Sequence, residues 1–317
     1  GKRRWVLKAL KQEMTAHGTI HERHWDGVLT PGLINAHTHL QYSGMVQVGQ
    51  GTYDRFRAWE LAFNEVYAEA QKTQPWKQWA EDGARQMVES GTTAAADIVT
   101  DLDAAGALAS QGMHGIAYWE VMGWHNAEWM EKGRTELIRQ LRRMNEEQLP
   151  NLGISPHAPY TLESEPFVDL PDIARQLNMR LHIHLAETPL EAGTYPPVLT
   201  TYSAADWSDH DWESYRQLKE VGKGASAIQF VDQLGSLGPD VHIAHGVWAN
   251  GEDRRILRQR GVGVALCPRS NRITNTGKDA PVREYLEEGN LVSVGTDSLS
   301  STPTLDLLDD VSMLYDL

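Results

Sequence analysis

Short apolar segments recur along the chain, and each ends in polar residues before a stretch with helical periodicity begins. The helical stretches include Trp76–Ser90, Glu136–Glu147 and Asp253–Arg260. Strands that alternate with helices predict a parallel sheet, and eight such units predict closure into an α/β fold of the (β/α)8 TIM-barrel type. The eight predicted strands are Leu33–Leu40, Thr92–Val99, Gly115–Met122, Leu152–Tyr160, Leu181–Glu187, Val241–Trp248, Val262–Pro268 and Leu291–Asp297.

Two long connections and a short N-terminal segment interrupt this regular pattern. Residues 44–54 predict a loop and Arg55–Ala70 a helix, and long connections of this kind lie on the catalytic face of a barrel. Gly193–Trp212 is rich in Pro, Ser, Asp and Tyr and predicts a surface loop or lid. Thr19–Trp25 predicts a strand packed on the barrel.

Length and composition are those of one barrel domain. The chain has 317 residues, and such a barrel needs roughly 250. The N-terminus is basic but has no apolar core, so we predict no signal peptide, and no apolar run approaches the ~20 residues of a membrane span. The single cysteine, Cys267, excludes a disulfide framework and is expected to be a small buried hydrophobe. These features favour a cytoplasmic protein.

The formal net charge of −14 argues against binding to nucleic acid or anionic membranes. We therefore expect a small-molecule substrate, and the sequence leaves open whether the protein is a homodimer. The 13 histidines are more informative, because several lie in apolar segments where an imidazole needs a partner.

The segment PGLINAHTHL carries the strongest chemical signal. His37 and His39 are two residues apart near the end of a predicted strand, so both side chains point to the same side. Two imidazoles so placed can share a metal ion, although an isolated HxH pair is also common among ordinary polar histidines. The preceding Pro-Gly and the apolar run favour the metal-ligand interpretation.

Further titratable residues follow other predicted strands, and a barrel brings such strand ends into one mouth. His182 and His242 lie earlier on their strands, and we interpret them as structural. The residues at strand ends are His157 in SPHAPYT, His184 and Glu187 in RLHIHLAET, His245 in VHIAHGVW and Asp297 in GTDSLSS.

This combination of motifs resembles the amidohydrolase superfamily, in particular its mononuclear aminohydrolase branch of deaminases and chlorohydrolases. The resemblance runs from Thr30 to about Leu308. It implies a metal-dependent hydrolase that acts on a C–N bond of a cyclic amidine. It also implies that His37, His39, His184 and Asp297 bind the metal, that Glu187 shuttles protons, that His245 orients the attacking water, that Asp297 also accepts a proton, and that His157 contacts the substrate.

Three histidines and one carboxylate suit Zn²⁺, with Fe²⁺ as the alternative. Two-metal relatives usually bridge their metals through a lysine on strand four. Predicted strand four, LGISPHAPY, has no lysine, and predicted strand three offers Glu120 but no lysine. We therefore predict one divalent metal.

Substrate contacts are less clearly marked. Gln41 can hydrogen-bond a substrate, and the aromatic residues that follow it can stack on a flat ring, although core packing explains them equally well. Two arginines after strand seven can meet an anionic tail, and solvated surface arginines are the alternative. The aromatic residues are Tyr42, Phe56 and Trp59, and the arginines are Arg269 and Arg272.

Within the branch, HTHLQYSG, SGTT, SPHAPYTL and CPRSN most resemble aminodeoxyfutalosine deaminases of menaquinone synthesis. The alternatives are methylthioadenosine/S-adenosylhomocysteine or guanine-type deaminases, a triazine-type chlorohydrolase, and a degenerate barrel kept for binding. Family members usually add a β-sandwich. We interpret residues 1–29 as a short remnant of it and residues 30–317 as the barrel, so the sandwich is expected to be absent or reduced.

Overall fold

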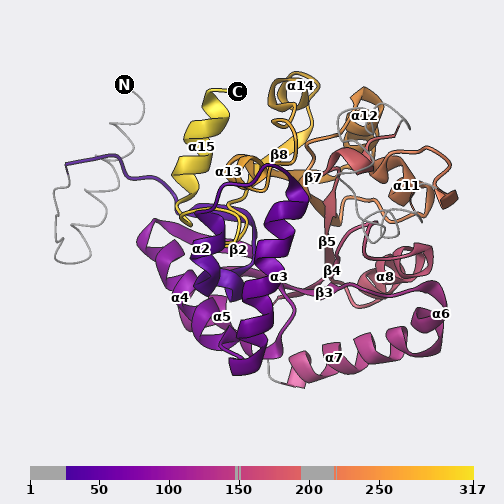
Figure 1. The fold of residues 1–317 in the computed structure, drawn as a ribbon, viewed down its shortest axis with the longest axis horizontal. Helices are drawn as coiled ribbons and strands as arrows, with labels where there is room; N and C mark the ends of the chain where they lie inside the picture. The colour runs from indigo at the N-terminus through magenta and orange to yellow at the C-terminus, as the bar shows by residue number, and fades with distance from the viewer. Residues whose placement is uncertain (1–25, 147–148, 150, 194–217, 219) are drawn as a thin grey trace, which may run out of the picture. The chain divides into compact units, whose positions relative to one another are not determined.

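A computed structural model describes residues 26–146, 149, 151–193, 218 and 220–317. Gly32–Leu317 forms one compact unit, built on eight parallel strands in the order β1 to β8 with helices around them (Figure 1). The predicted (β/α)8 barrel is confirmed. The strands are β1 (Leu33–Thr38), β2 (Thr92–Val99), β3 (His114–Val121), β4 (Leu152–Pro156), β5 (Arg180–Leu185), β6 (Val241–His245), β7 (Gly263–Leu266) and β8 (Leu291–Val294).

The helices follow the strands as the periodicity predicts. The helix expected at Arg55–Ala70 spans Phe56–Thr73, and the other three predicted helical stretches each match one helix within two residues at either end. The helical elements are η1 (Leu40–Met45), α2 (Val46–Gly49), α3 (Phe56–Thr73), α4 (Trp76–Glu89), η2 (Leu102–Ala104), α5 (Ala107–Ser110), α6 (Asn126–Glu128), η3 (Trp129–Gly133), α7 (Arg134–Glu146), α8 (Ser164–Gln176), η4 (Pro189–Glu191), α11 (Ala227–Gln233), α12 (Gly251–Arg260), α13 (Pro268–Ile273), α14 (Val282–Glu287) and α15 (Leu307–Tyr315).

The first and last strands meet through a buried polar connection. The Asn35 amide donates to Thr296 Oγ1 at 2.7 Å, and its Oδ1 accepts the Thr296 backbone N–H at 3.1 Å. The backbone N–H of Asp297 donates to His37 O at 2.9 Å. Gly295 permits this close approach, because a Cβ there would lie 2.9 Å from the backbone nitrogen of His37. The closure of the barrel thus places the end of β1 beside the turn after β8.

Two apolar clusters hold the helices on the sheet. The larger one packs β3–β7 against their helices, with Trp129 and Phe167 fully buried. The smaller one includes Leu40 of η1, Trp76 of α4 and Leu299 after β8. Burial of each such side chain contributes roughly 1.5–3 kcal/mol. The second cluster therefore fixes the loops after β1 and β8, which flank the mouth of the barrel.

Among the described residues, no helix is long and apolar enough to cross a membrane. The strand predicted at Thr19–Trp25 and all but Gly193 of the predicted loop or lid Gly193–Trp212 lie outside the described residues.

Candidate metal centre

The four predicted metal ligands converge where strands β1, β5 and β8 end. His37 lies on β1, His39 follows it, His184 lies on β5 and Asp297 follows β8. His39 Nε2 and His184 Nε2 are 3.2 Å apart, and Asp297 Oδ1 lies 3.5 Å from His37 Nε2 and 3.6 Å from His39 Nε2. All four side chains are buried. Residues separated by 260 positions thus present their polar atoms to one point.

The donors in this cluster fit a divalent metal. Neither ring nitrogen of His37 has a hydrogen-bond partner among the described residues, although the side chain is fully buried. The ligand atoms of His37, His39 and His184 all lie within 4.8 Å of one another. A buried imidazole without a partner is costly unless it binds something, and three histidines with one carboxylate match the preferences of Zn²⁺ or Fe²⁺.

Hydrogen bonds around these donors fix their orientation. His184 Nδ1 donates to His157 O at 3.1 Å, which leaves Nε2 as the free nitrogen facing His39. Asp297 Oδ2 accepts from Ser270 Oγ at 2.7 Å and from Ser301 Oγ at 2.9 Å. Outer contacts of this kind orient metal ligands and tune their basicity.

A second group of side chains lies beside the cluster. Glu187 Oε1 is 3.5 Å from His245 Nε2, and Tyr160 donates to Glu187 Oε2 at 3.2 Å. His245 Nδ1 donates to Asn271 Oδ1 at 2.9 Å, so its Nε2 faces the interior of the site. His37, His245 and Asp297 also have ligand atoms within 4.8 Å of one another. Glu187 and His245 are therefore close enough to exchange protons with a reactant held near His37.

His157, predicted to contact the substrate, lies beside His184, with ring centroids 4.8 Å apart. Its Nδ1 is 2.8 Å from Thr161 Oγ1. Glu120 of β3 lies on the same side, with Oε1 3.9 Å from His184 Nδ1. Burial, followed by the charge of Asp297, raises the pKa of Glu120 to about 8.

Burial governs the protonation of the site. It lowers the pKa values of His37 and His184, and that of His39 to about 3. Burial alone would raise the pKa of Asp297, but the contact with His37 holds it well below its usual range. At neutral pH the cluster therefore offers neutral imidazoles and one carboxylate, the forms in which these groups bind metals.

The pKa values of Glu187 and His245 are instead raised. Burial raises the pKa of Glu187. Burial would lower the pKa of His245, but the charges of Glu187 and Asp297 raise it. The raised pKa values favour the protonated form of each group.

Three backbone positions at the mouth adopt the left-handed conformation without being glycine. They are Ala186 with φ +54°, His245 with φ +73° and Asp297 with φ +61°. Such positions cost roughly 1–3 kcal/mol each and persist only where the surrounding structure imposes them. Here the turns start at the strand ends and redirect the following side chains into the site.

The residues predicted to contact a substrate are bound to other parts of the protein. Gln41 Oε1 accepts the backbone N–H of Thr100 at 2.8 Å, and its amide nitrogen donates to Thr100 Oγ1. Trp59 donates to Ser300 O at 2.7 Å and packs between Phe56 and Phe63. For Trp59 and Phe56 this arrangement agrees with the packing alternative.

The two arginines after β7 are also paired within the protein. Arg269 contacts Asp310 at 2.7 Å and Asp309 at 3.0 Å on α15, and it also donates to Thr304. Arg272 is exposed and pairs with Asp279 at 2.9 Å. Each guanidinium thus has an acceptor within the protein. Arg272 agrees with the alternative of a solvated surface arginine, whereas Arg269 forms a largely buried ion pair that neither interpretation of the sequence included.

Several residues at the site have roles that sequence reasoning did not assign. Asn271 and Ser270 lie on α13, within the CPRSN segment, and contact His245 and Asp297. Tyr160 contacts Glu187 from the turn after β4. Glu191 is a further such residue. The sequence marks it by the T-P-L-E spacing of a capping box, in which Thr188 lies three residues before Glu191.

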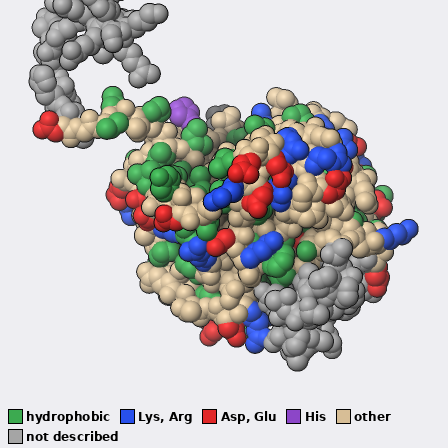
Figure 2. Space-filling model, turned by 90° about the horizontal axis from the view of Figure 1, so that it is seen from above, with side chains coloured by type: hydrophobic (Ala, Val, Ile, Leu, Met, Phe, Trp, Pro, Cys, Tyr) green, Lys and Arg blue, Asp and Glu red, His purple; other side chains and the backbone are tan. Residues whose placement is uncertain are grey.

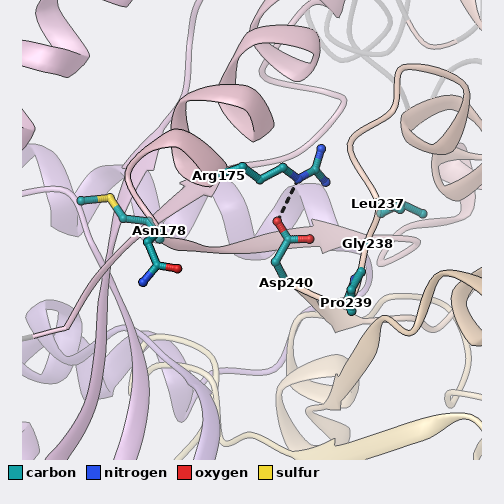
Figure 3. Close-up of a pocket in the computed structure, with 7 residues that line it drawn as sticks. Arg175, Asn178, Leu237, Gly238, Pro239 and Asp240 are labelled. Atoms are coloured by element: carbon teal, nitrogen blue, oxygen red, sulfur yellow. Dashed lines mark hydrogen bonds and ion pairs between the residues drawn. The ribbon is translucent and has the colours of Figure 1, made fainter.

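Other features of the surface do not compete with this cluster. A pocket at the opposite end of the barrel is lined by residues before β5 and β6, including an ion pair of 3.0 Å between Arg175 and Asp240 (Figure 3). It contains none of the clustered histidines. Acidic and basic side chains intermingle on the face drawn in Figure 2, without a uniformly basic patch.

The fold and the cluster together define a barrel protein with a histidine-rich metal-binding set at the carboxyl ends of its strands. The sequence model of the Amidohydrolase family matches residues 28–195 and 199–317, and the chain belongs to this family.

The relatives of this chain include deaminases of adenosine derivatives. The 5-methylthioadenosine/S-adenosylhomocysteine deaminase of Thermococcus kodakarensis is 30% identical over 292 residues, which cover 90% of this chain and 62% of the relative. The 5'-deoxyadenosine deaminase of Methanopyrus kandleri is 30% identical over 292 residues, which cover 90% of this chain and 61% of the relative. The chain thus spans about three fifths of these relatives.

A solved structure shows the same fold. The crystal structure of aminofutalosine deaminase from Helicobacter pylori aligns with a TM-score of 0.67 and 20% identity, covering 89% of this chain and 66% of that one. At this identity the likeness establishes the shared barrel.

Proposed function

We propose that this protein is a metal-dependent hydrolytic deaminase of 6-aminopurine nucleosides. The observation that carries the proposal is the convergence of His37, His39, His184 and Asp297 with Glu187 and His245 beside them. Membership of the amidohydrolase family and the similarity to adenosine-type deaminases support it. We propose one metal, Zn²⁺ in preference to Fe²⁺.

Different residues of the site would carry out different steps of the hydrolysis. A divalent metal held by the three histidines and Asp297 would lower the pKa of a water towards ~7. His245 through Nε2 and Asp297 through its carboxylate would be the groups that accept the proton of such a water. Glu187, whose pKa is raised by burial, can hold a proton and donate it to a ring nitrogen, which makes the adjacent carbon a better electrophile. Once it has taken up the proton that the water released, passed on by His245 at 3.5 Å, the same carboxyl can protonate the departing amine, which leaves as ammonia.

The substrate we propose is an adenosine derivative modified at its 5′ position. The named relatives act on methylthioadenosine, S-adenosylhomocysteine and 5′-deoxyadenosine, which share this feature. Aminodeoxyfutalosine, which the sequence motifs favour, has a bulky anionic 5′ extension and belongs to the same class. The ion pairs of Arg269 remove the earlier reason for preferring an anionic tail.

Ammonia release from a panel of substrates tests this proposal. The panel contains methylthioadenosine, 5′-deoxyadenosine, aminodeoxyfutalosine, adenosine, guanine and cytosine. We expect release from 5′-modified adenosines, with one equivalent of zinc per chain by elemental analysis. Glu187→Gln keeps the shape of the side chain but removes its transferable proton, so it should retain the metal and lose ~10²–10⁴-fold in kcat.

Two results would contradict the proposal. One is a Glu187→Gln variant that keeps more than about a tenth of the wild-type rate, against the loss expected for a general acid–base group. The other is release of chloride from chlorotriazines without release of ammonia from any nucleoside, which would favour the chlorohydrolase alternative on the same barrel.

A further inference from the structure

A buried carboxylate outside the proposed reaction holds the turn that carries Glu187. Glu191 is fully buried at the end of η4. Its Oε1 accepts the backbone N–H of Ala186 at 2.9 Å, and its Oε2 accepts those of Glu187 at 2.9 Å and Thr188 at 2.8 Å. Three successive amides therefore point at one side chain.

This arrangement explains how the strained turn persists. Ala186 has φ +54° and is fully buried, so the chain reverses sharply between β5 and Glu187. The carbonyl of Ala186 accepts from the backbone N–H of Trp248 at 2.7 Å, so both polar backbone groups of this residue are bonded. Three hydrogen bonds that converge on one carboxyl group can together impose a conformation that alanine disfavours.

We propose that Glu191 is a positioning residue that holds the Glu187 carboxyl at its working place between His245 and Tyr160. The Glu187 side chain is held at its tip by Tyr160, and its backbone is held by Glu191. A small displacement of an acid–base group lowers the rate steeply, because proton transfer requires a short, aligned contact. This inference rests on the proposed function, since it assumes that Glu187 transfers a proton.

Glu191→Gln is the direct test, because glutamine turns one acceptor oxygen into an NH2 group that faces the same amides. We expect kcat to fall roughly 10–100-fold while KM changes by less than about threefold, because the substrate and metal contacts remain. Metal content should stay at that of the wild type. Hydrogen–deuterium exchange of the segment His184–Ala192 should become roughly tenfold faster, because local opening then breaks fewer hydrogen bonds to residue 191.

The chain offers a matched control in Asp253. This carboxylate is also fully buried and also closes a capping box, but its hydrogen bonds go to Ser226, Gln229 and Asn250. Asp253→Asn should lower the stability of the protein to a similar degree. It should leave kcat and the exchange of His184–Ala192 close to wild type.

A double variant separates positioning from a general structural role. If Glu191 acts through Glu187, adding Glu191→Gln to Glu187→Gln should lower the residual rate by less than about twofold. Losses that multiply, or a Glu191→Gln rate no lower than that of Asp253→Asn, would overturn the inference. Should Glu191→Gln not fold, Glu191→Asp keeps the charge but shortens the side chain, and the same comparisons apply.

These outcomes are distinct from failure of the proposed function. A Glu187→Gln variant with an undiminished rate would refute the proposed function itself. An impaired Glu187→Gln with an unimpaired Glu191→Gln would refute only the positioning role.

Discussion

The carboxylate of Asp310 on α15 is fully buried, and Arg269 supplies the guanidinium that neutralises it. Burial raises the pKa of Asp310 to about 6 even though Arg269 lowers it. Loss of Arg269 would leave a buried acid that must take up a proton or remain unpaired. The contribution of this arginine is therefore to the attachment of α15 to α13.

Arg269→Ala should lower the free energy of unfolding by about 3 kcal/mol, near the lower end for breaking a buried ion pair because Asp310 can be protonated. Urea unfolding measures this loss. Arg272→Ala is the control, since its exposed pair with Asp279 should contribute less than about 1 kcal/mol. The preference for anionic over neutral nucleosides should not change. A rise in the KM of Arg269→Ala for the anionic substrate alone would show that Arg269 contacts the substrate.

At the residue scale, sequence patterns predicted the clustering of the histidines with Asp297 but not the partners of each side chain. The HxH pair follows the period of two of a strand, and the barrel brings the strand ends together, so the convergence of the histidines follows from these two rules. The HxxE spacing does not follow from that period, because the chain turns at Ala186 between the histidine and the glutamate. The contacts of Gln41 and Arg269 depend on loops whose paths have no such period. Polar residues near a mouth can face either a ligand or a neighbouring loop, and only the three-dimensional arrangement distinguishes the two.

At the scale of elements, the turns after the strands determine where the site residues point. The predicted strands β1 and β4 to β8 continue two to four residues too far, because the polar residues after them were included in the runs. In two cases the added residues contain a left-handed position that is not glycine, Ala186 and Asp297, and β6 ends on the left-handed residue His245. Apolar periodicity predicts where a strand lies, but it does not predict that the chain reverses its direction at a residue other than glycine.

The hydrogen bonds that connect β1 with the turn after β8 should matter for stability and for metal affinity. Asn35→Ala removes the side chain that bonds Thr296, leaving its buried N–H without this partner. We expect a loss of about 1–3 kcal/mol in stability and a metal affinity reduced roughly 10–100-fold, since Asp297 loses its alignment with His37. Competition with a chromogenic chelator measures the affinity.

Ser293→Ala serves as its control. Ser293 also makes a side-chain bond between strands, to Val264 O at 3.2 Å, but on β8 away from Asp297. Its metal affinity should equal that of the wild type. Equal affinities in all three proteins would show that the strand connection does not align the ligands.

For the molecule as a whole, the buried histidines link stability to pH. Burial lowers the pKa of His39 to about 3 and that of His157 to about 4, from an ordinary value of 6.5. Between these values the unfolded chain binds protons that the native protein does not. The contribution of these histidines to stability therefore falls as the pH falls from 6.5 towards 4.

In the metal-free protein, each such histidine should contribute a slope of up to about 1.4 kcal/mol per pH unit in this window. Urea unfolding after treatment with a chelator, repeated from pH 7 to pH 5, measures it. Saturating zinc at 1,000 times its Kd should add about 4 kcal/mol at pH 7. Glu120 and Asp310, whose pKa values are raised to about 8 and about 6, contribute slopes of the opposite sign, so the histidine contribution is read as the difference in slope between the wild type and His157→Gln. Equal slopes in the two proteins would mean that His157 is not buried and neutral in the folded protein.

Two of the predicted metal ligands come from opposite ends of the barrel sequence. His37 lies in the first strand and Asp297 after the last, and they face each other only when β1 and β8 meet. During synthesis, a ribosome must therefore release more than 250 residues after His37 before the complete set can exist. Metal capture is then a late event, because a nascent chain that has exposed only its first seven strands holds the three histidines of this set without Asp297.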